Sequence, residues 1–134
     1  LHSMGLSKEK HSYPAHLSLG MSRRVAIIRA FANNPNLLLM DEPFVSLDPP
    51  TARTVRQLLV DLWQKRPHSI LFVTHDLREA ITLADRLIFL DSKPMAVKKE
   101  ILVTIPREER GNEIRIEQFR QQLFIDYPEI LTLL

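Results

Sequence analysis

The stretch Leu37-Leu38-Leu39-Met40-Asp41-Glu42 decides the fold of this chain. Its four apolar residues follow one another without alternation, which is typical of a short β-strand covered on both faces. Such strands occur in parallel sheets that carry helices on each side. The two carboxylates come where the strand ends. The sequence therefore predicts an α/β fold with a buried strand over residues 37–40.

A helix is predicted before and after this strand. Upstream, apolar residues recur at helical spacing from Met21 to Ala32, Ser18 is suited to cap the helix, and Asn33-Asn34-Pro35 ends it. Downstream, Asp48-Pro49-Pro50 is typical of a helix start, and Pro67 ends that helix. The strand is therefore expected to be flanked by helices.

The alternation of strands and helices continues along the chain. Two further apolar runs, Ile70 to Val73 and Leu87 to Leu90, indicate strands. Between them, Asp76 and Glu79 have the spacing of a capping box for a short helix. The order strand, helix, strand, helix, strand is typical of a parallel sheet. We therefore predict one parallel sheet that contains all three strands.

Beyond the third strand the pattern changes. Residues 95–105 favour one or two short strands, residues 107–112 a polar linker, and residues 116–127 an amphipathic helix. We therefore predict two parts, residues 1–91 and a short C-terminal β/α extension over residues 92–134.

Composition excludes several classes of protein. The 134 residues include no cysteine, which excludes disulfides, thiolate zinc sites and a cysteine nucleophile. A net charge of +2 is too small to indicate a nucleic-acid-binding protein. The three glycines, Gly5, Gly20 and Gly111, are too far apart for a dinucleotide fingerprint or a P-loop. Any phosphate contact of these residues must therefore use other groups.

Polar side chains follow two of the predicted strands. Asp41 and Glu42 follow the first strand, and His75 follows the second. Ligands of open α/β sheets bind at the carboxyl ends of the strands. There one carboxylate can hold Mg²⁺, a second can activate water, and an imidazole can donate a hydrogen bond to a phosphoryl group. An Asp-Glu pair after a strand is also a common way to open a loop, so both interpretations stay open on these residues alone.

The predicted helix that begins near Ser18 offers free backbone N–H groups at its first turn, which can bind an anion. A plain capped helix is the simpler interpretation of the same residues.

In this order the segments resemble the nucleotide-binding subunit of ABC transporters. Residues 17–21 resemble the LSGGQ signature, residues 37–43 the Walker B strand, residues 45–48 the D-loop and residues 73–76 the switch-histidine loop. The resemblance covers about residues 13–91. Within the family it is strongest to importers of the nitrate, sulfonate and taurine type. It implies the C-terminal part of a P-loop NTPase domain that binds ATP and Mg²⁺.

The resemblance also implies roles for single residues at the catalytic centre. Asp41 would hold Mg²⁺, Glu42 would polarise the attacking water, and His75 would contact the γ-phosphate. These roles suit phosphoryl transfer, which depends on positioning and charge stabilisation. The implied activity is ATP hydrolysis that powers solute import.

A second group of residues is implied to face a partner. Ser18 and Gly20 would reach the γ-phosphate bound by a second ATPase subunit, and Asp48 would lie at the subunit interface. The other implied partners are transmembrane permease subunits, with the protein peripheral on the cytoplasmic face of the membrane and no nucleic acid involved.

Two departures from the family pattern leave alternatives open. Leu19 stands where the signature has glycine, and Ser22-Arg23 stands where its glutamine would follow. The phosphate and glutamine loops of the family are expected before residue 13 and are not in this sequence, so we expect a fragment of a longer protein. A non-catalytic or degenerate truncated ATPase is the main alternative. DNA-repair and chromosome-maintenance ATPases share these motifs, but they carry long coiled coils before the signature, and no heptad run is seen here.

Overall fold

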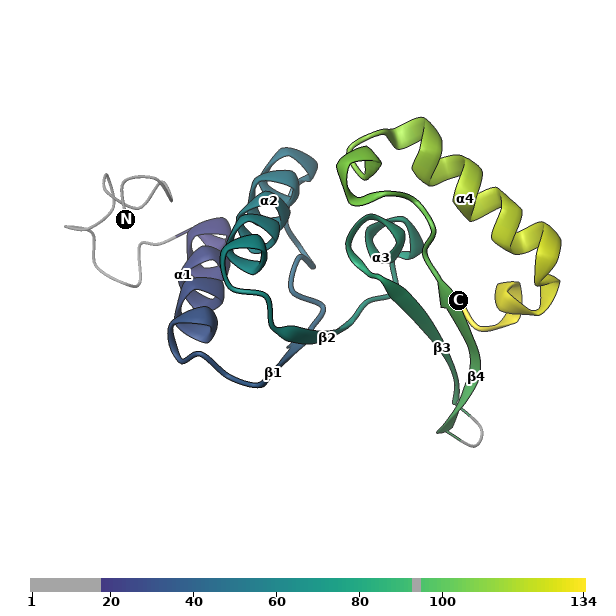
Figure 1. The fold of residues 1–134 in the computed structure, drawn as a ribbon, viewed down its shortest axis with the longest axis horizontal. Coiled ribbons are helices and arrows are strands. Elements are labelled where there is room, and N and C mark those ends of the chain that lie inside the picture. Colours follow the sequence, from purple (N-terminus) through teal and green to yellow (C-terminus); the bar gives the residue numbers. More distant parts are fainter. Residues whose placement is uncertain (1–17, 93–94) are drawn as a thin grey trace. The chain divides into compact units, whose positions relative to one another are not determined.

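The computed structural model describes residues 18–92 and 95–134 (Figure 1). The chain forms two compact units that divide between Val73 and Thr74. The interpretation of residues 1–17 lies outside the described residues, and the domain boundary at residues 91 and 92 stays a prediction. Within the described ranges, no helix combines the length and apolar character that crossing a bilayer requires.

The first unit has the order helix, strand, helix, strand. Its elements are α1 (Leu19–Ala32), β1 (Leu37–Asp41), α2 (Pro49–Lys65) and β2 (Ser69–Val73). The two strands pair in parallel, with Leu37 opposite Ser69 and Asp41 opposite Val73. The predicted α/β fold with a parallel sheet and flanking helices is confirmed.

Both helices of the first unit begin at the predicted caps. The Ser18 hydroxyl accepts a hydrogen bond from the Met21 N–H at 3.1 Å. The Asp48 carboxylate accepts one from the Thr51 N–H at 3.2 Å. These bonds satisfy N–H groups that have no partner inside a helix. The short sequence signals at the two helix starts are therefore sufficient to place them.

The sheet of the first unit is covered on one face only. Leu38 and Met40 are buried under α1 and α2, which lie on the same side of the strands (Figure 1). Leu37 and Leu39 are 57% and 69% exposed. Within the first unit the prediction of a strand buried on both faces is wrong, because none of that unit's described elements packs on this second face.

The second unit has a hairpin at its centre. Its elements are α3 (Leu77–Leu83), β3 (Arg86–Ser92), β4 (Met95–Leu102), α4 (Glu113–Asp126) and the 3-10 helices η4 (Arg107–Glu109) and η5 (Pro128–Thr132). β3 pairs antiparallel with β4, with Arg86 opposite Leu102. The prediction that the third strand joins the parallel sheet is wrong for the described residues. Two strands joined by a short connection pair antiparallel, and β4 follows β3 directly, so β3 pairs with β4.

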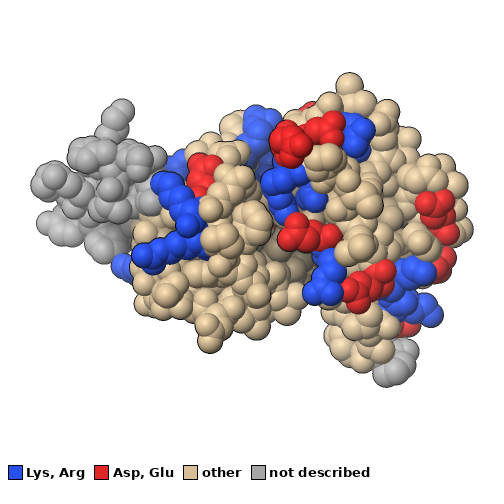
Figure 2. Space-filling model, in the orientation of Figure 1, with Lys and Arg blue, Asp and Glu red and all other residues tan. Residues whose placement is uncertain are grey.

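A separate core holds the second unit together. It comprises the buried side chains of Leu77, Ile81, Leu87, Phe89, Val103, Ile105, Ile116, Leu123 and Ile130. Acidic and basic side chains are interspersed on its surface (Figure 2), where Arg86 and Glu100 form an ion pair at 2.8 Å. The C-terminal residues therefore pack directly around α3 and β3.

The segment 107–112 is not the polar linker that its composition indicates. It contains η4, and the Arg110 side chain is buried, with 8% of the residue exposed. A charged residue is buried in this way only when its donors are satisfied, and Arg110 donates to backbone carbonyls such as Ile81 O at 2.9 Å.

Candidate functional site

Two carboxylates lie at the end of the parallel sheet in the first unit. Asp41 is the last residue of β1 and is exposed. Glu42 follows it and is half-buried, and its N–H donates a hydrogen bond to the Val73 carbonyl at 2.7 Å. This bond ties Glu42 to the last residue of β2. The predicted position of both carboxylates at the carboxyl edge of the sheet is confirmed.

The loop after β1 holds Glu42 in a strained backbone conformation. Its φ is 45°, and Ser46 in the same loop has a φ of 67°. Such left-handed conformations cost a residue with a side chain about 1–3 kcal/mol and persist where the surroundings enforce them. Here the adjacent Phe44 is 4% exposed and anchors the loop in the core. The backbone conformation of Glu42 is therefore fixed by the fold.

The exposed position of Asp41 fits a magnesium ligand. In residues 18–92 and 95–134, no three His, Asp or Glu side chains gather into a complete metal site. Mg²⁺ does not require such a site, because it commonly binds one or two carboxylates and keeps water and substrate phosphates as its other ligands. A single carboxylate at the edge of the sheet is sufficient for that type of binding.

Asp48 has a structural role in its own chain. Hydrogen bonds from the Thr51 hydroxyl and backbone N–H lower the pKa of the Asp48 carboxyl below its ordinary value of 3.8. The ionised cap therefore stabilises the fold above that value, and its contribution is lost as the pH falls through the lower folded-state pKa. The carboxylate is fixed at the start of α2.

Gly20 packs against the start of α2. It is buried, and a Cβ built on it would lie 2.6 Å from Thr51 Cγ2. The first turns of α1 and α2 thus approach so closely that a side chain at residue 20 would overlap the Thr51 methyl group. Leu19, beside it, is 44% exposed. The predicted nucleotide contacts of Ser18 and Gly20 stay predictions.

We expect Gly20→Ala to destabilise the protein. The added methyl group overlaps Thr51, and overpacking of this kind costs about 1–3 kcal/mol. Alanine recovers part of this loss, because glycine is roughly 0.5–1 kcal/mol less favourable in a helix. Chemical denaturation of both proteins measures the net loss in the free energy of unfolding.

Thr51→Ser is the matched second change, because it removes Cγ2 and keeps the hydroxyl at the start of α2. The double variant is expected to regain most of the stability lost by Gly20→Ala. Equal losses with and without Thr51→Ser would contradict the proposed overlap.

His75 precedes the short helix of the second unit. The Asp76 carboxylate accepts a hydrogen bond from the Glu79 N–H at 3.2 Å, so the predicted cap of α3 is confirmed. The Asp76 N–H in turn donates to the Thr74 hydroxyl at 3.0 Å. These two bonds fix the backbone on either side of His75, whose side chain is exposed.

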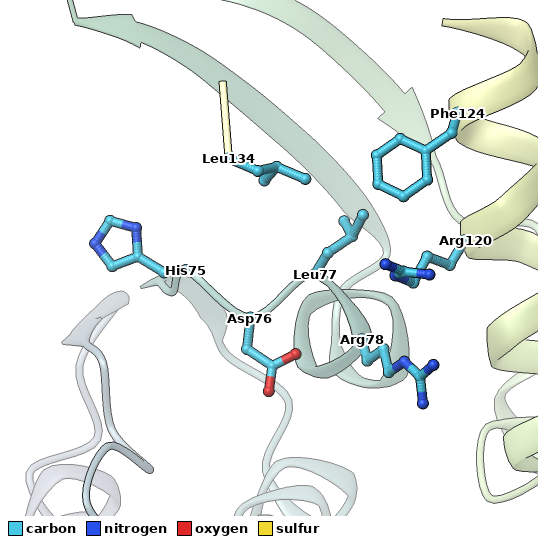
Figure 3. Close-up of a pocket in the computed structure, with 7 residues that line it drawn as sticks. All are labelled: His75, Asp76, Leu77, Arg78, Arg120, Phe124 and Leu134. Atoms are coloured by element: carbon cyan, nitrogen blue, oxygen red, sulfur yellow. The ribbon is translucent and has the colours of Figure 1, made fainter. Parts of the chain in front are cut away.

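An open pocket of about 530 Å³ adjoins His75. It is lined by His75, Asp76, Leu77, Arg78, Arg120, Phe124 and Leu134 (Figure 3). The imidazole is directed away from Arg78 and Arg120. The His75 ring is therefore not turned toward the basic side chains of its own unit.

A parallel pair of strands, the first of which ends in Asp41 and is followed by Glu42, places this chain among α/β proteins whose ligands bind at the carboxyl ends of the strands. Solved structures support that class. The chain is similar to an ABC transporter in an inward-facing conformation, with a TM-score of 0.66 and 26% identity, over 84% of this chain and 45% of that one. It is also similar to a dimeric ATP-binding cassette in a post-hydrolysis state bound to ADP and Pi, with a TM-score of 0.61 and 33% identity, over 78% of this chain and 44% of that one.

Sequence comparison gives the same class. The ABC transporter family matches residues 1–45. The nitrate import ATP-binding protein of Synechocystis sp. is 38% identical over 130 residues, which are 96% of this chain and 49% of that protein. An aliphatic sulfonates import ATP-binding protein of Pseudomonas savastanoi pv. phaseolicola is 41% identical over 123 residues, which are 92% of this chain and 45% of that protein.

The chain thus spans about half the length of the curated relatives it matches. It belongs to the family of ABC transporter ATP-binding proteins, and its relatives include the import type that the motifs indicated.

Proposed function

We propose that the protein containing these residues binds and hydrolyses ATP, and that hydrolysis powers the import of a solute across a membrane. The observation that carries the proposal is the carboxylate pair at the end of β1, in a chain related to import ATP-binding proteins along nearly its whole length. Two relatives are named for nitrate and for aliphatic sulfonates, which supports a small oxygen-rich anion as the solute.

The catalytic roles follow from the chemistry of three side chains. Asp41 would hold the Mg²⁺ that accompanies ATP, and the ion would offset the negative charge of the phosphates. Glu42 would accept a hydrogen bond from the attacking water and polarise it, and the fixed backbone of its loop supports this role. His75, exposed before α3, donates a hydrogen bond to the γ-phosphate.

The proposed partners are a second ATPase subunit and transmembrane permease subunits. Ser18 and Asp48 are exposed where α1 and α2 begin, and Gly20 keeps the two helix starts close together. This surface is suited to meet a nucleotide held by the second subunit. The dimeric relative with ADP and Pi supports that assembly. The proposed location is the cytoplasmic face of the membrane.

The isolated 134-residue chain is expected to bind MgATP no more tightly than about 1 mM, or about −4 kcal/mol. Most N–H groups and the lysine that cradle phosphates come from a P-loop, which this sequence does not contain. Isothermal titration calorimetry of the chain and of the full-length protein provides the measurement. Micromolar binding to the chain alone would contradict the expectation that most of the phosphate-binding groups lie outside these 134 residues.

A non-catalytic form of the protein is the second candidate, favoured by the leucine in the signature position. Release of phosphate from ATP by the full-length protein with its permease subunits separates the two. Hydrolysis that requires Glu42 supports the ATPase, and its absence supports the non-catalytic form.

A further inference from the structure

The C-terminal end of α3 lacks the usual means of satisfying its backbone carbonyls. Helices often end in a glycine in the left-handed conformation, which lets later N–H groups turn back to the last turn. Here the capping residue is Ala84, in an extended conformation, and its N–H reaches only the Ala80 carbonyl, at 2.8 Å. The carbonyls of residues 81–84 must therefore find donors elsewhere.

Two arginines of the C-terminal region supply those donors. Arg110 Nη1 donates to three carbonyl oxygens, and Arg107 Nη1 donates to the fourth. The acceptors are Ile81 O at 2.9 Å, Thr82 O at 3.3 Å and Ala84 O at 3.0 Å for Arg110, and Leu83 O at 2.8 Å for Arg107. Together the two side chains reach every carbonyl left open at this helix end.

The position of Arg110 is itself fixed. Its Nε donates to the Ile105 carbonyl at 2.8 Å, which ties it to the segment after β4. Burial and the nearby Arg107 lower the pKa of Arg110, and Asp85 opposes that shift. A guanidinium nevertheless keeps its proton in proteins, and a positive charge is favourable at a helix C-terminus. Arg110 is thus a rigid, charged clamp on α3.

The first turn of α3 is also held by the C-terminal region. Arg78 forms an ion pair with Glu117 of α4, and Glu117 also accepts a hydrogen bond from Arg120 at 3.0 Å. The side chain of Leu77 is buried in the core shared with α4. Residues after β3 therefore hold α3 at both of its ends.

We propose that Arg110, with Arg107, is a positioning residue for His75. His75 lies two residues before α3, and a helix of seven residues is only about 10 Å long, so a shift of its clamped end moves the other end as well. The C-terminal region would then set the orientation of the imidazole toward the γ-phosphate. This inference rests on the proposed function, in which His75 contacts ATP.

The first test replaces the clamp in the full-length protein. Arg110→Lys keeps the charge but cannot reach all the carbonyls, and Arg107→Gln removes the bond to Leu83 while leaving Arg110 in place. Each is expected to lower kcat about 10-fold or more, since small misplacements of catalytic groups can cost up to about 10²-fold. The KM for ATP is expected to change much less than kcat. Arg115→Met, at an exposed arginine of α4, is the matched control and should leave both unchanged.

The decisive test is a double-mutant cycle with His75→Ala, assayed well below the melting temperature of each variant. If the arginines act through His75, Arg110→Lys lowers kcat in the wild-type background but has little further effect when His75 is absent. Equal fold-losses in both backgrounds would overturn the positioning role and leave the proposed function intact. An unchanged kcat for His75→Ala alone would overturn the assigned role of His75, and the inference with it.

Discussion

Glu42→Gln in the full-length protein is expected to lower the rate of ATP hydrolysis about 10²–10⁴-fold, the usual effect of losing a general base. Glutamine keeps the shape of the side chain but cannot take a proton from water. ATP binding should survive, because the phosphates are held by other groups, and the ATP-bound dimer should accumulate. Phosphate release, nucleotide binding and size-exclusion chromatography with ATP measure the three effects.

The control for this change is Asp61→Asn, which neutralises a carboxylate at an exposed position of α2. It should leave turnover unchanged. The melting temperature of Glu42→Gln should also stay near that of the wild type, because the backbone cost of a left-handed conformation is similar for glutamate and glutamine. Unchanged hydrolysis in Glu42→Gln would show that Glu42 has no catalytic role and is only a loop residue.

Leu19→Gly is expected to raise ATP hydrolysis or strengthen ATP-dependent dimerisation of the full-length protein. Leu19 is 44% exposed in the first turn of α1, so its side chain would meet a phosphate group that approaches this turn. Loss of one preorganised donor contact costs about 2.7–4 kcal/mol of transition-state stabilisation, and a partial loss costs less. A gain of up to about 10²-fold is therefore the upper limit.

Leu19→Ala separates the two ways in which the leucine could act. Leu19 does not have a positive φ, so the conformational freedom of glycine is not required there. Alanine removes most of the bulk without weakening the helix start, and it should give much of the gain with no loss of melting temperature. A slower and less stable Leu19→Gly would contradict the approach of a phosphate and indicate that the leucine packs within its own protein.

Local signals in the sequence predicted much of the fold. Ser18, Asp48 and Asp76 can be identified as caps from the sequence because each capping side chain bonds to an N–H only three residues ahead. The position of Asp41 and Glu42 at the end of β1 can also be predicted, because the apolar run of the strand stops directly before them. Features that depend on a few adjacent residues can be predicted from the chain alone.

Features that depend on distant partners could not be predicted in this way. The apolar run of β3 is equally suited to a parallel or an antiparallel neighbour, and only the pairing with β4 decides between them. Arg110 looks like a surface residue in a polar segment, yet three of its four acceptors lie 26 to 29 residues away. The strained φ of Glu42 has no local sequence signal either, because glutamate rarely adopts it.

That backbone conformation sets stability against activity at a single position. Glycine adopts a φ of 45° without the penalty that a side chain brings, so a search for stabilising substitutions would favour Glu42→Gly. The same substitution deletes the carboxylate that we assign to the attacking water. Selection for a durable fold and selection for turnover therefore act in opposite directions at residue 42, and the glutamate indicates which of the two has prevailed.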